Sequence, residues 1–378
     1  MNPLRKLAEF GQSIWVDNLQ RSYITKGTLK KFIDEDGLTG LTSNPTIFQK
    51  AVSGSDDYQD LFDAAKGRGL SGNDLYEQLA VRDVRGAADL LRGVYDATKG
   101  RDGYASLEVS PRLALDTKAT LEEARRLWKT LDRPNVMIKV PGTEAGVPAF
   151  EQLTAEGINV NVTLLFSQTR YRQIAEAYVS GLEKLAASGG DVSRVASVAS
   201  FFVSRIDALV DKEIEKKLKA GATPEQQKAL EGVSGKVAIA NAKLAYRAYK
   251  EVFSGARWKA LEAKGAKVQR VLWASTSTKS PKLRDVLYVE ELIGRDTVNT
   301  LPPATIDAFR DHGKVRASLE EDLPAAEATM RQLEAGGVSM QAVTEELARD
   351  GIRLFEESFD QLLSAVDEKL KKTASSSP

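Results

Sequence analysis

The chain of 378 residues contains no cysteine and a single histidine. The absence of cysteine excludes disulfide bonds, thiol nucleophiles and thiolate metal sites. Because His312 is the only imidazole, a metal centre built from several histidines is impossible, and a histidine-dependent catalytic triad would need that residue. His312 lies in the polar segment FRDHGK, where we expect a surface or packing role.

The chain also lacks a net charge and a long apolar run. Lys and Arg together number 53, as do Asp and Glu, so the formal net charge is zero. This balance argues against binding to nucleic acid or to an anionic membrane through a global field, but it allows a local basic pocket. No run approaches the length of a membrane span, and the N-terminus has no apolar signal core. We expect a soluble, cytoplasmic protein with no nucleic acid or membrane partner.

What the chain does contain is a regular alternation of short apolar runs with amphipathic segments such as 111–131 and 167–187. The nearly continuous apolar runs are typical of parallel strands that are covered on both faces. This order predicts an α/β protein, and it fits a closed (β/α)8 TIM barrel better than an open sheet with a phosphate loop after its first strand. The expected strands are 13–17, 38–44, 105–110, 135–140, 158–163, 195–202, 270–276 and 297–302.

Helical segments extend this single domain, 1–372, beyond a minimal barrel. We expect helical insertions at about 46–100 and 207–235, the second one charged and solvated, and helices packed outside the barrel at 303–372. Residues 373–378 are expected to form a flexible tail. The segment GRGLSG (67–72) matches G-x-G-x-x-G, but it follows a helical pattern instead of a strand, so we interpret it as a polar loop.

Polar side chains occur where the expected strands end, which is the active-site end of a TIM barrel. Several of them have an equally good structural explanation when taken singly. Asp17 is suited to cap a helix, and Asn44 forms a turn pair with the proline that follows it. As a set, however, they are unexpected, because ordinary core strands would not all have polar side chains at the same end. The set is Asp17, Asn44, Glu108, Lys139, Asn161, Thr163, Ser200 and Ser275.

Lys139 is the most informative member, because it interrupts the apolar run NVMIKVP. A lysine is rarely buried unless a partner pairs with it or its amine is used. Burial and nearby cations lower the pKa of a lysine, so a neutral amine becomes available to attack a ketone and form a Schiff base. Cleavage of a carbon–carbon bond through that imine needs a carboxylate for a hydroxyl proton and a second acid–base group for water. Asp17 and Glu108 supply two carboxylates on different strands.

These motifs resemble the transaldolase family, in the longer bacterial form of the class I Schiff-base sugar aldolases. The resemblance runs in order from about residue 12 to residue 313 and is carried by VDNLQR, GLTSNPT, LEVS, MIKVPGT, INVNVTLLFS and ASFFVSR. It implies a (β/α)8 barrel whose Schiff-base lysine lies on the fourth strand, where our strand count places Lys139. It also implies the pentose phosphate pathway, phosphorylated ketose and aldose substrates, and no cofactor.

The resemblance assigns four catalytic roles. Lys139 would be the nucleophile. Asp17 would deprotonate the C4 hydroxyl during cleavage and return the proton after transfer. Glu108, helped by Thr163, would hold the water that takes part in imine formation and hydrolysis.

The resemblance also assigns substrate-binding roles. The hydroxyls of the dihydroxyacetone unit would be bound by Asn44, Asn161 and Ser200. Arg205 would bind the sugar phosphate together with Ser275. Shorter family members have an arginine where this chain has Ser277, and we expect Lys279 to supply that charge.

Two related functions follow. One is a transferase that moves a dihydroxyacetone unit from sedoheptulose 7-phosphate to glyceraldehyde 3-phosphate, giving erythrose 4-phosphate and fructose 6-phosphate. The other is a fructose-6-phosphate aldolase-type lyase that releases dihydroxyacetone. Glu108 favours the transferase, because the related lyases have glutamine there. A glycoside hydrolase with two carboxylates would leave Lys139 unexplained, and a silent scaffold would not need every catalytic position filled. The sequence leaves open whether the chain is a monomer or a homodimer.

Overall fold

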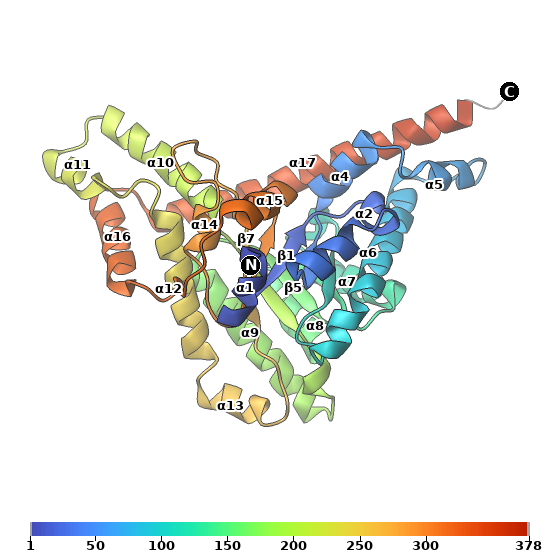
Figure 1. Cartoon of the computed structure of the whole chain (residues 1–378), viewed down its shortest axis with the longest axis horizontal. Coiled ribbons are helices and arrows are strands. Elements are labelled where there is room, and N and C mark those ends of the chain that lie inside the picture. Colours follow the sequence, from blue (N-terminus) through green and yellow to red (C-terminus); the bar gives the residue numbers. More distant parts are fainter. Residues whose placement is uncertain (1, 376–378) are drawn as a thin grey trace.

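The computed structural model describes residues 2–375, and its centre is a closed barrel of eight parallel strands (Figure 1). The strands follow one another around the barrel in chain order, and the eighth pairs with the first. They are β1 (Gln12–Asp17), β2 (Gly40–Thr42), β3 (Tyr104–Glu108), β4 (Val136–Pro141), β5 (Val160–Leu165), β6 (Ser197–Phe202), β7 (Arg270–Ala274) and β8 (Thr297–Leu301). The predicted TIM barrel is therefore confirmed.

Helices surround the barrel and form most of the connections between strands. The α-helices are α1 (Pro3–Lys6), α2 (Arg21–Thr25), α3 (Thr28–Lys31), α4 (Pro45–Gly54), α5 (Gln59–Ala64), α6 (Gly72–Ala97), α7 (Thr117–Leu131), α8 (Gly146–Ala155), α9 (Gln168–Ala187), α10 (Ser204–Lys219), α11 (Pro224–Leu230), α12 (Val237–Val252), α13 (Ala256–Glu262), α14 (Leu287–Glu290), α15 (Pro303–His312), α16 (Leu323–Ala335) and α17 (Met340–Ser375). Short turns of other helix types are η1 (Leu7–Phe10), η2 (Phe32–Asp36), η3 (Pro111–Leu113) and η4 (Val192–Arg194).

The strands are buried because helices cover their outer faces and side chains fill the interior. Every residue of β3 to β8 is buried, which explains their continuous apolar runs. One close approach fixes the register of β1 against β2, where Trp15 pairs with Gly40. A Cβ atom at Gly40 would lie 2.4 Å from the Trp15 indole, so a larger residue there would push the two strands apart.

The helical insertions take two forms. Residues 46–100 are occupied mainly by α4, α5 and α6, and GRGLSG lies in the loop between α5 and the start of α6. The second insertion differs in part from our expectation of a solvated segment. Ile206 and Val210 in the first turns of α10 are buried against the core, and exposed residues prevail only in the later part of the helix. The end of α10 projects with α11 and α16 at one side of the molecule (Figure 1).

Helix α17 departs most from the expectation of helices outside the barrel. Its 36 residues run along α4 and α6 and across the carboxyl end of the barrel (Figure 1). Gly351 allows this approach, since a Cβ there would lie 2.9 Å from the side chain of Leu164 at the end of β5. The helix continues to Ser375, so residues 373–375 of the expected flexible tail have helical backbone, while 376–378 lie outside the described residues.

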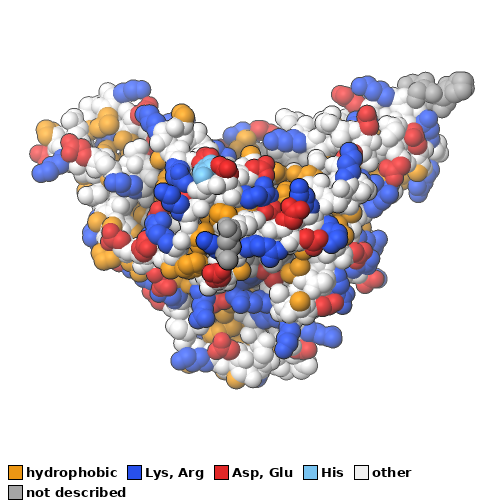
Figure 2. Space-filling model, in the orientation of Figure 1, with side chains coloured by type: hydrophobic (Ala, Val, Ile, Leu, Met, Phe, Trp, Pro, Cys, Tyr) orange, Lys and Arg blue, Asp and Glu red, His pale blue; other side chains and the backbone are white. Residues whose placement is uncertain are grey.

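The surface carries intermixed charges of both signs. Figure 2 shows Lys and Arg side chains interspersed with Asp and Glu over the visible face, as the zero net charge indicates. No helix within residues 2–375 is long and apolar enough to cross a lipid bilayer.

Candidate active site

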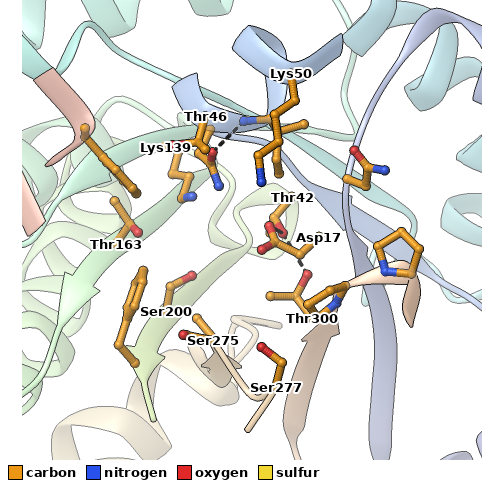
Figure 3. A pocket seen from close by; sticks show the side chains of 18 of the residues that line it. Asp17, Thr42, Thr46, Lys50, Lys139, Thr163, Ser200, Ser275, Ser277 and Thr300 are labelled. Atoms are coloured by element: carbon orange, nitrogen blue, oxygen red, sulfur yellow. Dashed lines mark hydrogen bonds between the residues drawn. The ribbon is translucent and has the colours of Figure 1, made fainter. Parts of the chain in front are cut away.

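A cavity of about 450 Å³ lies at the carboxyl ends of the strands, with walls from the barrel, α4, α10 and α17 (Figure 3). Most of the residues that the sequence singled out line this cavity. They are Asp17, Asn44, Lys139, Thr163, Ser200, Arg205, Ser275 and Lys279. Two predicted residues, Glu108 and Asn161, do not line it.

Lys139 lies near the end of β4, and only 4% of its surface is exposed. The parallel register places it between Glu108 of β3 and Asn161 of β5. Lys139 Nζ is 3.5 Å from Glu108 Oε2 and donates a hydrogen bond of 3.2 Å to the main-chain oxygen of Ser43. The ring of Phe355, from α17, has its centre 5.9 Å from the ammonium nitrogen. The amine is thus buried and oriented by an ion pair, and it still faces the cavity.

Glu108 lies immediately behind Lys139. Burial raises the pKa of Glu108 to about 7, although the positive charge of Lys139 opposes the shift. Both carboxylate oxygens of Glu108, and Oγ1 of Thr163, are buried without a hydrogen-bond partner within the described part of the chain. Such unsatisfied buried oxygens are uncommon and ask for an explanation. They are suited to bind a water molecule or a reactant hydroxyl beside the amine.

Asp17 ends β1 and belongs to a hydrogen-bonded chain across three strands (Figure 3). Its Oδ1 accepts a hydrogen bond of 2.8 Å from Thr42 of β2, and Thr42 Oγ1 lies 2.7 Å from Oγ1 of Thr300 on β8. Because Thr42 donates its only proton to Asp17, Thr300 must donate to Thr42. Burial raises the pKa of Asp17, against the opposing effects of Lys139 and Thr42. This threonine chain was missed from the sequence, where its only signal is a threonine near each strand end.

The neutral polar residues of the site are held by side-chain hydrogen bonds. Asn44 caps α4, since its Oδ1 accepts a hydrogen bond of 3.0 Å from the Ile47 N–H. It therefore combines the capping role with a place in the cavity wall, and its NH2 group remains available. Ser200 Oγ donates to Asn161 Oδ1 at 2.7 Å, and Asn161 donates to Ser106 Oγ at 3.2 Å. Asn161 thus orients Ser200 from behind the cavity wall.

Three further cations line the cavity, namely Arg205, Lys279 and Lys50. The sequence analysis missed Lys50, which Figure 3 shows in the cavity wall. Within residues 2–375 none of them forms an ion pair with a carboxylate. The Arg205 guanidinium lies 5.2 Å from the centre of the Phe202 ring, and Lys279 donates a 3.0 Å hydrogen bond to Ser277. Burial, and then the charge of Arg205, lowers the pKa of Lys279. This excess of positive charge suits an anionic ligand.

Ser275 follows β7 and forms hydrogen bonds with the start of α10, the helix that carries Arg205. Its backbone is left-handed, with φ of 55°, which is an unfavourable conformation for a residue other than glycine. Two contacts hold it: its carbonyl accepts a 3.0 Å hydrogen bond from the Ser204 N–H, and the two serine hydroxyls are 3.0 Å apart. The strained turn therefore positions Ser275 beside the start of α10.

His312 lies away from this cavity. Its ring nitrogens are 3.0 Å from Asp311 and 2.9 Å from Asp285, and its side chain is partly exposed, so the expected surface role is confirmed. Over the described range, no group of three or more His, Asp and Glu side chains is arranged to hold a metal ion.

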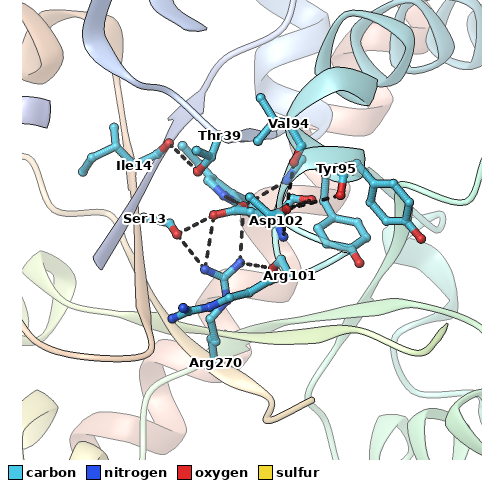
Figure 4. Close-up of polar contacts among 12 residues, drawn as sticks. Ser13, Ile14, Thr39, Val94, Tyr95, Arg101, Asp102 and Arg270 are labelled. Carbon is cyan, nitrogen blue, oxygen red and sulfur yellow. Dashed lines mark hydrogen bonds and ion pairs between the residues drawn. The ribbon is translucent and has the colours of Figure 1, made fainter. Parts of the chain in front are cut away.

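A second buried polar cluster lies at the amino ends of the strands, opposite the cavity, and Figure 4 shows its contacts. Asp102, just before β3, pairs with Arg270 at the start of β7, and both are only 4% exposed. Asp102 also accepts hydrogen bonds from Ser13 and, at 2.8 Å, from the Trp15 indole. Arg270 in turn donates to Ser13 at 2.7 Å and to the carbonyl of Arg101 at 3.0 Å. Polar groups at this end of a TIM barrel contribute to stability and not to catalysis.

Comparisons with known proteins agree with this geometry. Residues 14–366 match the family described as Transaldolase/Fructose-6-phosphate aldolase. The chain is 50% identical over 374 residues to Transaldolase 2 of Nostoc sp. (strain PCC 7120 / SAG 25.82 / UTEX 2576), with 98% of each chain covered. It is 49% identical to Transaldolase of Trichodesmium erythraeum (strain IMS101), again with 98% of each chain covered. Identity to Transaldolase 1 of Streptomyces coelicolor is 48%, covering 97% of this chain and 94% of the relative.

Proposed function

The chain belongs to the transaldolase/fructose-6-phosphate aldolase family, and we propose that it is a transaldolase of the pentose phosphate pathway that acts in the cytoplasm. It transfers a dihydroxyacetone unit from sedoheptulose 7-phosphate to glyceraldehyde 3-phosphate, giving erythrose 4-phosphate and fructose 6-phosphate. The observation that carries the proposal is a buried lysine amine, Lys139, that faces a cation-lined cavity with two carboxylates beside it.

Imine formation is the first chemical step. Lys139 gives a proton to the adjacent Glu108 carboxylate, its amine then attacks C2 of the ketose, and the C2 oxygen leaves as water. Glu108 has a pKa of about 7, because it is buried, so it can both accept and donate a proton near neutral pH. Its unsatisfied oxygens and that of Thr163 hold the departing water, and the same water attacks C2 when the imine is hydrolysed.

Cleavage of the C3–C4 bond follows. Asp17 removes the proton of the C4 hydroxyl, the C4 oxygen becomes the aldehyde of the departing aldose, and the bonding electron pair moves into the iminium. The resulting enamine attacks the aldehyde of the acceptor, and Asp17 returns its proton to the new C4 oxygen. The hydrogen bond from Thr42, supported by Thr300, stabilises the ionised carboxylate that begins each cycle.

The remaining residues bind the parts of the substrate that do not react. Asn44 and Ser200 bind hydroxyls of the dihydroxyacetone unit, and Asn161 keeps Ser200 in place. Arg205 forms the main contact to the sugar phosphate, since a guanidinium matches phosphate with two hydrogen bonds while an ammonium acts as a point charge. Lys279 is the auxiliary cation, and Ser275 adds a hydroxyl.

The proposal is tested by trapping the imine. Borohydride added with fructose 6-phosphate should inactivate the protein and add the mass of a reduced dihydroxyacetone unit to the peptide that contains Lys139. Erythrose 4-phosphate should protect the protein from inactivation by borohydride, because it accepts the dihydroxyacetone unit and frees Lys139. A label on another lysine, or turnover by Lys139→Ala, would contradict the assignment. Release of free dihydroxyacetone as the main product would favour the lyase.

A further inference from the structure

We infer that Lys50 of α4 binds the phosphate group of the sugar substrates, together with Arg205 and Lys279. The inference rests on the proposed function, because it names a residue that recognises the phosphorylated substrate of that reaction. The evidence is the orientation of α4, the charge of the cavity and the position of Lys50 relative to the other two cations.

The orientation of Lys50 follows from how α4 begins and packs. Asn44 caps the helix through the Ile47 N–H, which fixes where the first turn starts. Residues three and four apart lie on one face of a helix. The face of α4 that lines the cavity consists of Thr46, Ile47, Lys50 and Ala51. The other face buries Phe48 and Val52 in the core, so the helix cannot rotate Lys50 away without exposing them.

The charges around the cavity are unbalanced. Among the described residues, four cations line the cavity, and Asp17 is the one carboxylate in its wall. Lys139 already has Glu108 as its partner at 3.5 Å. Within residues 2–375, Lys50, Arg205 and Lys279 form no ion pair with a carboxylate. The pKa of Lys279 is lowered by burial, by Arg205 and also by Lys50, while the charge of Asp17 opposes the shift. A phosphate monoester carries a charge of about −1.5 to −2 at pH 7 and would reduce the mutual repulsion of the three cations.

Lys50 approaches from the opposite wall to Arg205. Arg205 follows β6 and Lys279 follows β7, whereas Lys50 follows β2. In a closed barrel whose strands run in chain order, β2 lies opposite β6. A phosphate bound by Arg205 and Lys279 alone would be contacted from one side, and Lys50 supplies the contact from the other. Its flexible stem suits sugar phosphates of different lengths, since a lysine ammonium needs no fixed geometry.

The test compares phosphorylated and unphosphorylated donors. Lys50→Gln removes the charge and retains most of the stem, and Lys50→Arg retains the charge. Lys264→Gln is the matched control, because Lys264 is an exposed lysine in the loop before β7, at the other end of the barrel. KM is measured for fructose 6-phosphate and for fructose, and the inhibition constant is measured for inorganic phosphate.

We expect Lys50→Gln to raise KM for fructose 6-phosphate about 10-fold to 100-fold, as for the loss of a hydrogen bond between charged groups. The inhibition constant of inorganic phosphate should rise in parallel, and KM for fructose should change much less. Lys50→Arg should recover most of the loss. High salt should reduce the difference in KM for fructose 6-phosphate between wild type and Lys50→Gln, since Lys50 is exposed and salt screens its charge.

An equal rise in KM for fructose 6-phosphate and for fructose in Lys50→Gln would overturn the inference. So would a KM for fructose 6-phosphate in Lys50→Gln that equals that of Lys264→Gln. Failure of the proposed function has a different signature, because the wild type would then form no imine that borohydride can trap. Phosphate inhibition in Lys50→Gln equal to that in wild type would likewise exclude Lys50 from the phosphate site while leaving the transaldolase proposal intact.

Discussion

The buried ion pair at the amino end of the barrel yields a stability prediction whose size can be worked out. We expect Asp102→Asn to destabilise the protein by about 3–5 kcal/mol, the usual effect of removing one partner of a buried pair. The reason is that Arg270, which is 4% exposed, would keep its charge without a carboxylate. The asparagine has nearly the same shape, so the loss reflects charge and hydrogen bonding and not a cavity.

This free energy converts into a measurable shift in melting temperature. An unfolding entropy of about 2.1 cal/mol/K per residue gives about 0.8 kcal/mol/K for a chain of this length. The predicted destabilisation therefore lowers Tm by about 4–6 °C. Imine trapping at 25 °C should be unaffected, because the cluster lies at the amino ends of the strands whereas Lys139 lies near the carboxyl end of β4.

Thermal and urea unfolding of matched variants would check the reasoning. Asp296→Asn is the control, since Asp296 pairs with Arg101 at 2.8 Å on the surface and such pairs contribute less than about 1 kcal/mol. The double variant Asp102→Leu/Arg270→Met should recover much of the loss, because no buried charge remains. If Asp102→Asn lowers the free energy of unfolding no more than Asp296→Asn does, the buried pair does not stabilise the barrel and the reasoning is refuted.

The catalytic roles give further predictions. Asp17→Asn should still form the imine but cleave slowly, whereas Glu108→Gln should slow imine formation and hydrolysis by on the order of 10²-fold; identical defects in pre-steady-state trapping would contradict this division. Because burial raises the pKa of Glu108 to about 7, imine hydrolysis in the wild type should accelerate as pH rises through 7 and Glu108 becomes an ionised base, and Glu108→Gln should lack this rise. Arg205→Ala should raise KM for phosphorylated donors far more than for unphosphorylated ones, with part of the loss in kcat. Lys279→Ala should show the same pattern more weakly, and equal losses with both kinds of donor would exclude a phosphate role.

The sequence was sufficient to predict the barrel, because its strands carry a strong local signal. Buried parallel strands are apolar along their whole length, and β3 to β8 are fully buried. Strand ends such as Lys139 and Thr163 point to the cavity because all eight strands are parallel and their carboxyl ends meet. The catalytic roles of these residues remain predictions.

The residues that were missed depend on contacts between distant segments. Lys50 looks like any helical surface lysine until α4 docks beside the cavity, and Phe355 looks like a core residue of a terminal helix. The chain from Thr300 through Thr42 to Asp17 depends on hydroxyl positions across three strands. Conversely, Asn161 was expected in the cavity wall but lies behind Ser200, because the strand register and not the residue type decides which side chain is in front.

The course of α17 has a consequence for protein synthesis. The last barrel strand ends at Leu301, but the ring that covers Lys139 belongs to Phe355, within the final helix. A nascent chain emerges from the ribosome with its N-terminal part first. Such a chain can therefore close its barrel before α17, which contributes the Phe355 wall of the cavity, has been translated. The pocket is completed only when α17 docks, so we expect catalytic competence to arrive after α17 has been translated and not with the closure of the barrel.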